Sequence, residues 1–340
     1  TPSGRERVDE IAQGLSGPWA SSKFRLELVA KALSALHCFV RDEHYLVDDD
    51  KVKIIDEFTG RVMADRTWEH GLHQMIEVKE GCEASSRRKT IARVSYQRFF
   101  RRYLRLSGMT GTASSAAAEL WSIYGMKVSR IPTNRPGQRH VYQDRMFRSA
   151  DAKWQAIVAR IREMYETGRP VLVGTRSVAN SEILSSALTQ AGIEHVVLNA
   201  RQDSEEAEIV ARAGMTGTIT VATNMAGRGT DIKLGTGIAE LGGLHVIATE
   251  RHESSRIDRQ LFGRCARQGD PGGSQAFVSA DDELLEKFLS KPEKRMLRSA
   301  LKARRAGAEK LFNAYRIRAQ KKSERTAAKQ RKSVLRMDFW

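Results

Sequence analysis

Residues 218–231 read TITVATNMAGRGTD, and this stretch decides the fold. Its first six residues are apolar or β-branched, which is typical of a buried strand, and the rest forms a glycine-rich turn. The same alternation continues on both sides, with strands expected at 171–175, 195–198, 244–249 and 275–279 and helices at 152–166, 181–191, 205–213 and 255–265. Near-continuous apolar strands alternating with helices predict an α/β fold, in which a parallel sheet carries helices on both faces.

The glycine-rich turn at 224–231 has the side chains of a phosphate-binding loop. Glycine lets the backbone approach a ligand closely, and Arg228 offers the planar donor fork that suits phosphate. Asp231 can accept a hydrogen bond from a ribose hydroxyl or orient a neighbouring arginine. A purely structural turn is the alternative interpretation of this segment.

A second motif, QLFGRCARQGD, occupies residues 260–270. Arg264 and Arg267 are three residues apart, which predicts that they share one helix face. Two guanidinium groups facing a cleft are what a transferring γ-phosphoryl group requires as charge develops. An ordinary basic helix end is the alternative. We expect the two motifs to lie at the ends of adjacent parallel strands, with the ligand at the carboxyl ends.

The remaining segments are less regular. Residues 1–88 predict a helix at 24–37, two strands around the acidic turn 48–50 and a helix at 71–80. Residues 89–135 predict a helix, a small-residue turn at 107–112 and a strand at 128–131. Residues 291–340 are expected to be helical, with an apolar packing stripe.

Positive charge is concentrated in the last 50 residues. They hold 17 Lys and Arg against four Asp and Glu, whereas the other 290 residues hold 40 against 37. This basic tail predicts an anionic partner, which could be lipid, ribosomal RNA or an acidic protein face; a solvated helix in an assembly is the alternative.

Three scattered cysteines, Cys38, Cys82 and Cys265, argue against a disulfide framework and a zinc site, so we predict no metal ligand and a reducing compartment. No apolar run approaches the ~18 residues of a membrane span. The polar first ten residues show no secretory signal. Because the chain begins with Thr1, we interpret it as part of a longer chain or as a processed product.

The two motifs match motifs V and VI of superfamily-2 ATPases, the helicase-like motors. Further blocks closely resemble the SecA preprotein-translocase ATPases, over roughly residues 40–290: NMAGRGTD at 224–231, GGLHVI at 242–247, TERHES at 249–254, DEFTGR at 56–61, GLHQ at 71–74, GMTGTA at 108–113 and PTNRP at 132–136. The resemblance implies a RecA-like sheet in a helicase-like motor domain, with a small α+β region before it and a basic helical tail after it.

The resemblance also implies roles for single residues. Arg264 and Arg267 would be the motif VI arginines that reach ATP across an interdomain cleft, and Gln260 would help to position their helix. Motif III would lie at Gly111 and Thr112. The nucleotide would be contacted by the motif V residues Arg228, Gly229, Thr230 and Asp231.

Family organisation implies four segments. Residues 1–88 would end the preprotein cross-linking domain, 89–135 would close nucleotide-binding domain 1, 136–290 would form nucleotide-binding domain 2, and 291–340 would begin the scaffold helix. Two departures stand out. Cys265-Ala266 replaces the usual Ser-Gly between the motif VI arginines, and the chain contains no Gly-Lys dipeptide, so it has no Walker A motif.

The implied function is part of a SecA-type motor that couples ATP hydrolysis, with Mg²⁺, to movement of unfolded preproteins through the membrane Sec channel. Implied partners are the channel, preprotein, anionic phospholipid, the ribosome and a second copy. The implied location is the cytoplasm and, peripherally, the cytoplasmic face of the bacterial inner membrane. A nucleic-acid helicase and a non-hydrolysing adaptor paralogue are the alternatives. Without Walker A, the 340 residues alone are expected to be inactive.

Overall fold

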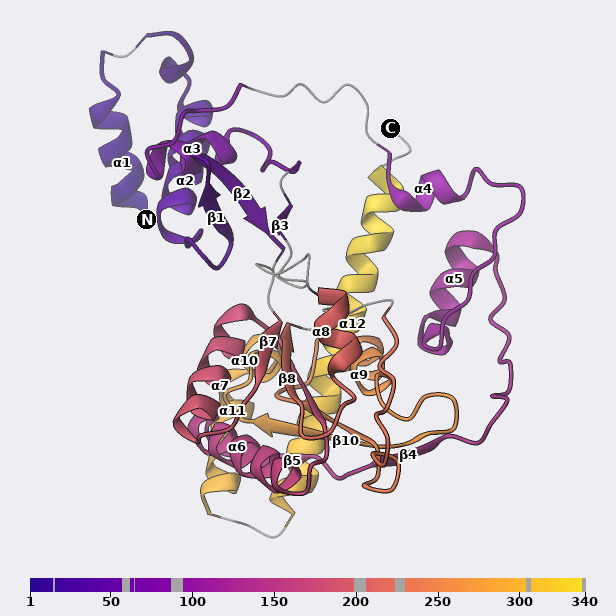
Figure 1. The fold of residues 1–340 in the computed structure, drawn as a ribbon. Helices are drawn as coiled ribbons and strands as arrows, with labels where there is room; N and C mark the ends of the chain where they lie inside the picture. Colours follow the sequence, from indigo (N-terminus) through magenta and orange to yellow (C-terminus); the bar gives the residue numbers. More distant parts are fainter. Residues whose placement is uncertain are drawn as a thin grey trace. The chain divides into compact units, whose positions relative to one another are not determined.

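The structure is a computed structural model that describes residues 1–14, 16–56, 62–63, 65–86, 94–198, 206–223, 230–303 and 307–337. The chain divides into two compact units, Thr1–Thr90 and Ile91–Trp340. Each unit is described by itself below. Figure 1 shows the elements of both, and none of the described helices has the length and apolar character that crossing a bilayer demands.

The first unit is a small α+β structure. Helices α1 (Pro2–Ile11), α2 (Ser22–His37) and α3 (Leu72–Lys79) and the short 3-10 helix η1 (Gly17–Ala20) accompany an antiparallel sheet of β1 (Tyr45–Asp48), β2 (Lys51–Ile55) and β3 (Val62–Met63). The expected acidic turn joins β1 to β2, and Asp49 and Asp50 both adopt positive φ there. Two such residues form the tight turn whose twist suits a hairpin.

A small core holds this unit together. Tyr45 is fully buried among Ala35, Val52, Ile76 and Cys82, so α2, the hairpin and α3 close on one another. The rest of the expected block DEFTGR, from Glu57 to Arg61, lies outside the described residues.

The second unit is dominated by a parallel sheet. The strands are β4 (Gln138–Val141), β5 (Arg145–Phe147), β6 (Val171–Thr175), β7 (Val196–Leu198), β8 (Ile219–Thr223), β9 (Leu244–Ala248) and β10 (Pro271–Ser279). Their order is β4-β10-β9-β6-β8-β7, β5 pairs with β10, and every pairing is parallel. The predicted α/β fold is therefore confirmed.

Alternating side chains of the central strands feed two cores, one on each face of the sheet. Val171 and Val173 of β6 pack with α6 (Ala150–Glu166) and α7 (Val178–Gln190), while Leu172 faces the opposite core. That opposite core includes residues of α8 (Glu206–Arg212), α9 (Ser255–Phe262), α10 (Glu283–Phe288), α11 (Lys291–Lys302) and α12 (Ala308–Met337). Since both faces are covered, β6, β8 and β9 are buried along their whole length.

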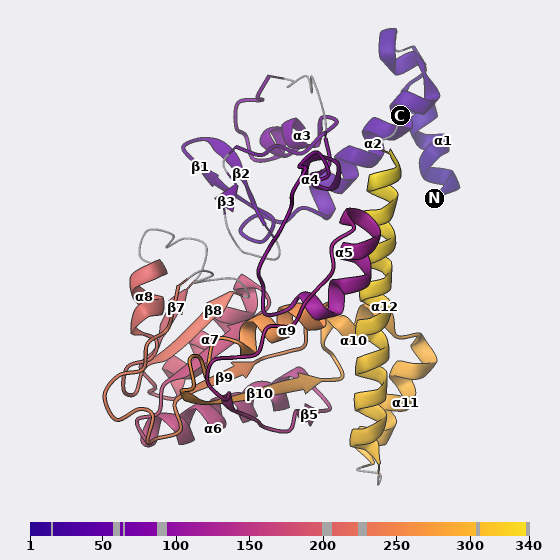
Figure 2. The ribbon, with the colours of Figure 1, turned by 90° about the vertical axis from the view of Figure 1, so that its right-hand side faces the viewer.

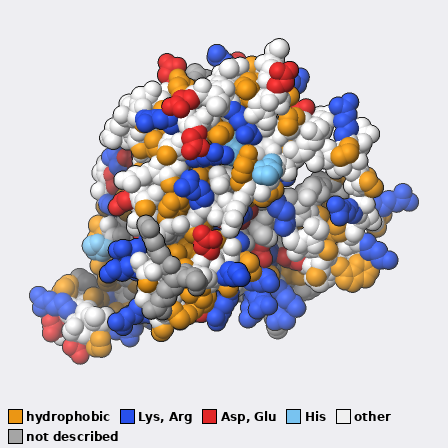
Figure 3. Space-filling model, turned by 90° about the horizontal axis from the view of Figure 1, so that it is seen from below, with side chains coloured by type: hydrophobic (Ala, Val, Ile, Leu, Met, Phe, Trp, Pro, Cys, Tyr) orange, Lys and Arg blue, Asp and Glu red, His pale blue; other side chains and the backbone are white. Residues whose placement is uncertain are grey.

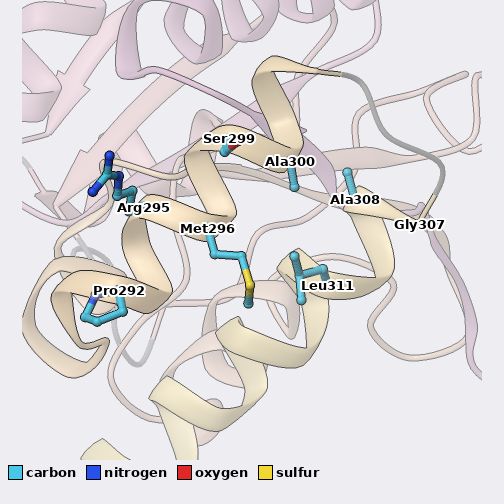
Figure 4. Close-up of a pocket in the computed structure, with 8 residues that line it drawn as sticks. All are labelled: Pro292, Arg295, Met296, Ser299, Ala300, Gly307, Ala308 and Leu311. Atoms are coloured by element: carbon cyan, nitrogen blue, oxygen red, sulfur yellow. The ribbon is translucent and has the colours of Figure 1, made fainter.

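The basic tail forms two helices, α11 and α12, rather than one. Leu297 of α11 and Phe312 of α12 are buried in the sheet's core, as the apolar stripe predicted. An open groove remains between the two helices, in which Met296 and Leu311 face each other (Figure 4). The tail is thus part of the folded unit. Lys and Arg side chains, interspersed with acidic and apolar ones, are widely spread over the face seen in Figure 3.

The segment before the sheet was predicted less well. The helix expected before the turn at 107–112 is limited, among the described residues, to α4 (Tyr96–Phe100), and residues 128–131 form no strand. After the 3-10 helix η2 (Ala113–Ala116) and α5 (Ala117–Tyr124), the chain runs irregularly to β4. A short apolar run is compatible with strand, loop or helix, and none of the described strands pairs with residues 128–131 to stabilise a strand there.

Candidate nucleotide-binding site

The two arginine-bearing motifs meet in the structure, although not where the sequence predicted. Asp231 lies eight residues after β8, and Arg267 lies four residues before β10. β8 and β10 are not neighbours, because β6 and β9 stand between them. The prediction that both motifs follow adjacent strands is therefore wrong: Thr230 and Asp231 lie beside the segment that enters β10.

An ion pair joins the two motifs. The Arg267 guanidinium donates from Nη1 to Asp231 Oδ1 across 2.8 Å, and its Nε donates to the Gly263 carbonyl at 3.1 Å. The side chains are 35% and 46% exposed. Of the two roles considered for Asp231, orienting an arginine is the one for which the structure shows a contact.

Arg264 reaches the same loop by another route. Its Nη1 donates to the backbone carbonyl of Thr230 at 3.2 Å. Arg264 and Arg267 thus bind consecutive residues of motif V, while Gln260 sits half-buried in the preceding helix. Arg228 and Gly229, expected to contact the nucleotide, lie outside the described residues.

The prediction that Arg264 and Arg267 share one helix face is wrong, because both follow the end of the helix. Helix α9 ends at Phe262 with Gly263 as its C-cap, and Ala266 and Gln268 both have φ of 54°. This left-handed backbone breaks the helical path, so Arg264 and Arg267 project from a turn.

Cys265 anchors the turn from inside. Its thiol is buried and lies 3.3 Å from the backbone carbonyls of both Phe262 and Gly273, either of which can accept its hydrogen bond. Arg139 in β4 donates to the Cys265 carbonyl at 3.0 Å. Burial raises the pKa of this thiol, which keeps it protonated and structural.

Contacts outside the motifs were not predicted. Arg259 of α9 donates to Ser115 Oγ in η2 at 2.6 Å, which joins α9 to the segment that follows residues 108–113. On α12, Arg331 forms a bidentate pair with Glu119 of α5 at 2.6 and 2.8 Å. Such pairs join residues more than 100 positions apart, and no local pattern indicates them.

A buried carboxylate cluster lies near the carboxyl end of β9. Glu250 accepts from Asn180 Nδ2 at 3.0 Å, and burial, with the charge of Asp282, raises its pKa. Asp282 itself pairs with Lys153 at 2.6 Å. Within the described part of the chain, no three His, Cys, Asp or Glu side chains are arranged to hold a metal ion.

A parallel sheet covered by helices on both faces, with Arg267 of one motif paired to Asp231 of the other, is the architecture of an α/β domain suited to binding an anionic ligand. Two family profiles match the chain: the SecA P-loop domain over residues 136–239 and 235–303, and the SecA preprotein cross-linking domain over residues 1–77. The chain belongs to the SecA family.

Curated relatives agree. Protein translocase subunit SecA 2 of Nitrosospira multiformis is 57% identical over 297 residues, covering 87% of this chain and 45% of that protein. SecA 2 of Bordetella avium is 48% identical over 338 residues, covering 99% and 51%. The chain therefore spans about half the length of these relatives.

A solved structure of the E. coli DEAD-box protein SrmB, bound to regulator of ribonuclease activity A, is 19% identical with a TM-score of 0.35. It covers 46% of this chain and 88% of that one. This likeness is too low to bear on function.

Proposed function

We propose that the complete protein is an ATPase that moves unfolded preproteins through the membrane Sec channel, and that this chain supplies its motifs III, V and VI. The observation that carries the proposal is the Arg267–Asp231 ion pair, which joins motif V to motif VI. The SecA family membership and the preprotein cross-linking profile over residues 1–77 support it.

ATP with Mg²⁺ is the proposed cofactor. The partly exposed guanidinium of Arg267 suits phosphate oxygens, because Asp231 and the Gly263 carbonyl hold it in orientation while the side chain stays accessible to solvent. Arg264 and Arg267 would stabilise charge on the γ-phosphate, and Thr230, Asp231, Gln260, Arg228 and Gly229 would shape the nucleotide site. ATP supplies the phosphoryl group whose transfer drives the motor; these arginines supply donors.

The proposed organisation keeps four segments: 1–88, 89–135, 136–290 and 291–340, as the end of the cross-linking domain, the closing piece of nucleotide-binding domain 1, nucleotide-binding domain 2 and the start of the scaffold helix. Partners would be the channel, preprotein and anionic phospholipid, with the ribosome and a second copy as further candidates. The protein would work in the cytoplasm and at the cytoplasmic face of the bacterial inner membrane.

The test is the stimulation of ATP hydrolysis. The complete enzyme is assayed with channel-containing membranes and an unfolded preprotein, and separately with RNA. We expect stimulation by channel and preprotein together. Stimulation by RNA alone would instead support the helicase alternative, and no hydrolysis under any condition would support the adaptor alternative.

A further inference from the structure

Three polar side chains lie on one face of the long helix α12, spaced four residues apart: Arg316, Gln320 and Glu324. A spacing of four places them one above another along the helix. All three contact the connection between β9 and α9 or its neighbours. In Figure 2, α12 runs beside this part of the unit.

Gln320 binds that connection in the interior of the unit. Its Nε2 donates to the His252 carbonyl at 2.8 Å and to Asp258 Oδ2 at 2.9 Å. Asp258 also accepts from the His252 backbone and ring, both at 2.9 Å. Burial opposes ionisation of Asp258, yet these bonds and the charge of Arg251 outweigh it and lower its pKa.

Arg316 joins the same cluster. It lies 3.8 Å from Asp144, the carboxylate that also binds Arg251. Arg316 therefore reaches the β9–α9 connection indirectly, through Asp144 and Arg251.

Glu324 acts as a cap supplied by one helix to another. Its Oε1 accepts from both the backbone N–H and the hydroxyl of Ser255, each at 2.8 Å. Ser255 is the first residue of α9, whose own N-cap, Ser254, accepts from the Arg256 N–H. A helix leaves its first N–H groups without internal partners, and a carboxylate there also meets the positive end of the helix dipole.

Because α9 has only eight residues, fixing its start also fixes its end. Immediately after it come Gly263 and the two arginines. We propose that Glu324 is a positioning residue: through α9 it sets where Arg264 and Arg267 point, so that a displacement of α12 moves the arginines. The proposal rests on the phosphate-binding role given above to these arginines.

The first test needs no activity. Amide hydrogen exchange of residues 255–267 is measured in this chain for Glu324→Ala, Glu324→Gln and Glu309→Ala. Glu309 is an exposed glutamate in the first turn of the same helix, so its loss makes the same charge change. We expect about tenfold faster exchange for Glu324→Ala and no change for Glu309→Ala. Glu324→Gln, which keeps the acceptor oxygen, should stay within about twofold.

Unchanged exchange in Glu324→Ala would overturn the proposal. If that variant fails to fold, Ser255→Pro removes the other partner of the same contact. Proline is tolerated at the first helical position and removes both donors to Glu324, so α9 persists without its tie to α12. Wild-type exchange at 259–267 in a folded Ser255→Pro variant would equally overturn it.

The second test is kinetic, in the complete enzyme. Glu324→Ala should lower kcat about tenfold with the KM for ATP within twofold, and should have little further effect in an Arg267→Ala background. If Glu324→Ala lowers kcat by the same factor in the Arg267→Ala background as in the wild type, or changes only the KM for ATP, the positioning role is overturned. If Arg267→Ala itself retains wild-type kcat, the proposed function fails instead, while hydrogen exchange still reports whether α12 fixes α9.

Discussion

Asp231 and Arg267 are 36 residues apart and share an ion pair of 2.8 Å, by which motif V holds the guanidinium of motif VI. Both side chains remain partly accessible to solvent. A surface pair of this kind contributes little to stability, roughly 0–1 kcal/mol, so it can open when a stronger anion arrives. The contact therefore orients Arg267 without trapping it.

Arg267→Ala should lower kcat of the complete enzyme by on the order of a hundredfold, or ~3 kcal/mol, because a donor to the developing phosphoryl charge is lost. Arg267→Lys should rescue poorly, since lysine lacks the planar fork. Steady-state ATPase assays measure the effect, with Arg336→Ala, at the exposed end of α12, as control. A wild-type kcat for Arg267→Ala would leave Arg264 as the candidate.

The 340-residue chain alone should not hydrolyse ATP, because no Gly-Lys dipeptide exists to place a Walker A lysine at the phosphates. Joining it to the P-loop-bearing remainder of a SecA chain should restore turnover. The measurement is phosphate release by the purified chain. Robust turnover that disappears in Arg267→Ala would contradict this prediction.

Ala266→Gly should stabilise the protein. Ala266 has φ of 54°, where a β-carbon costs roughly 1–2 kcal/mol and glycine costs little. After the entropy that glycine loses, we expect the free energy of unfolding to rise by about 1 kcal/mol in denaturant titrations. Ala159→Gly, on the exposed face of α6, is the matched control and should lower it by a similar amount. Destabilisation by both substitutions would contradict the left-handed backbone at Ala266.

Glu250→Gln should raise the free energy of unfolding at pH 7, on the order of 1 kcal/mol, because it removes a charge from a buried site. The pKa of Glu250 is raised above its usual value by burial, so the native protein binds a proton more tightly than the unfolded chain. The stabilisation that protonated Glu250 gives is complete below the pKa that this carboxyl has in the unfolded chain. It is lost as pH rises through the higher pKa of Glu250 in the native protein.

Comparing unfolding of the wild type and Glu250→Gln between pH 4 and pH 8 tests this sign. The difference should grow with pH. A difference that shrinks toward neutral pH would mean that ionised Glu250 is favoured in the native state.

Salt-sensitive binding to anionic vesicles should depend on the exposed basic residues of α12. The basic residues in the second half of this helix are Lys321, Lys322, Arg325, Lys329, Arg331, Lys332 and Arg336. Two of them are already engaged, because Arg331 binds Glu119 and Lys322 donates to the Phe288 carbonyl. Reversing Lys321, Arg325, Lys329 and Lys332 to glutamate should abolish flotation at low salt, as each basic residue contributes ~1 kcal/mol near such a surface.

The matched control reverses Arg5, Arg101, Arg102 and Arg105, which are also exposed and give the same change in net charge. It should still float. Equal flotation of both variants would show that the charge of α12 does not bind lipid.

The sequence by itself determined the sheet domain. Nearly continuous apolar strands such as Val171–Thr175 are stable only when helices cover both faces, so their pattern already implied the layers and the parallel pairing. Local chemistry was also sufficient for the turn at Asp49-Asp50, because hairpin geometry depends on neighbouring residues alone.

The tertiary structure decided where the site lies. The pairing of Arg267 with Asp231 depends on the packing of the segment that holds Thr230 and Asp231 beside the turn before β10. The cap that Glu324 gives to Ser255 joins residues 69 positions apart. Contacts at such separations arise only when the chain has packed, because a one-dimensional pattern records each residue's preferences and not its distant partner.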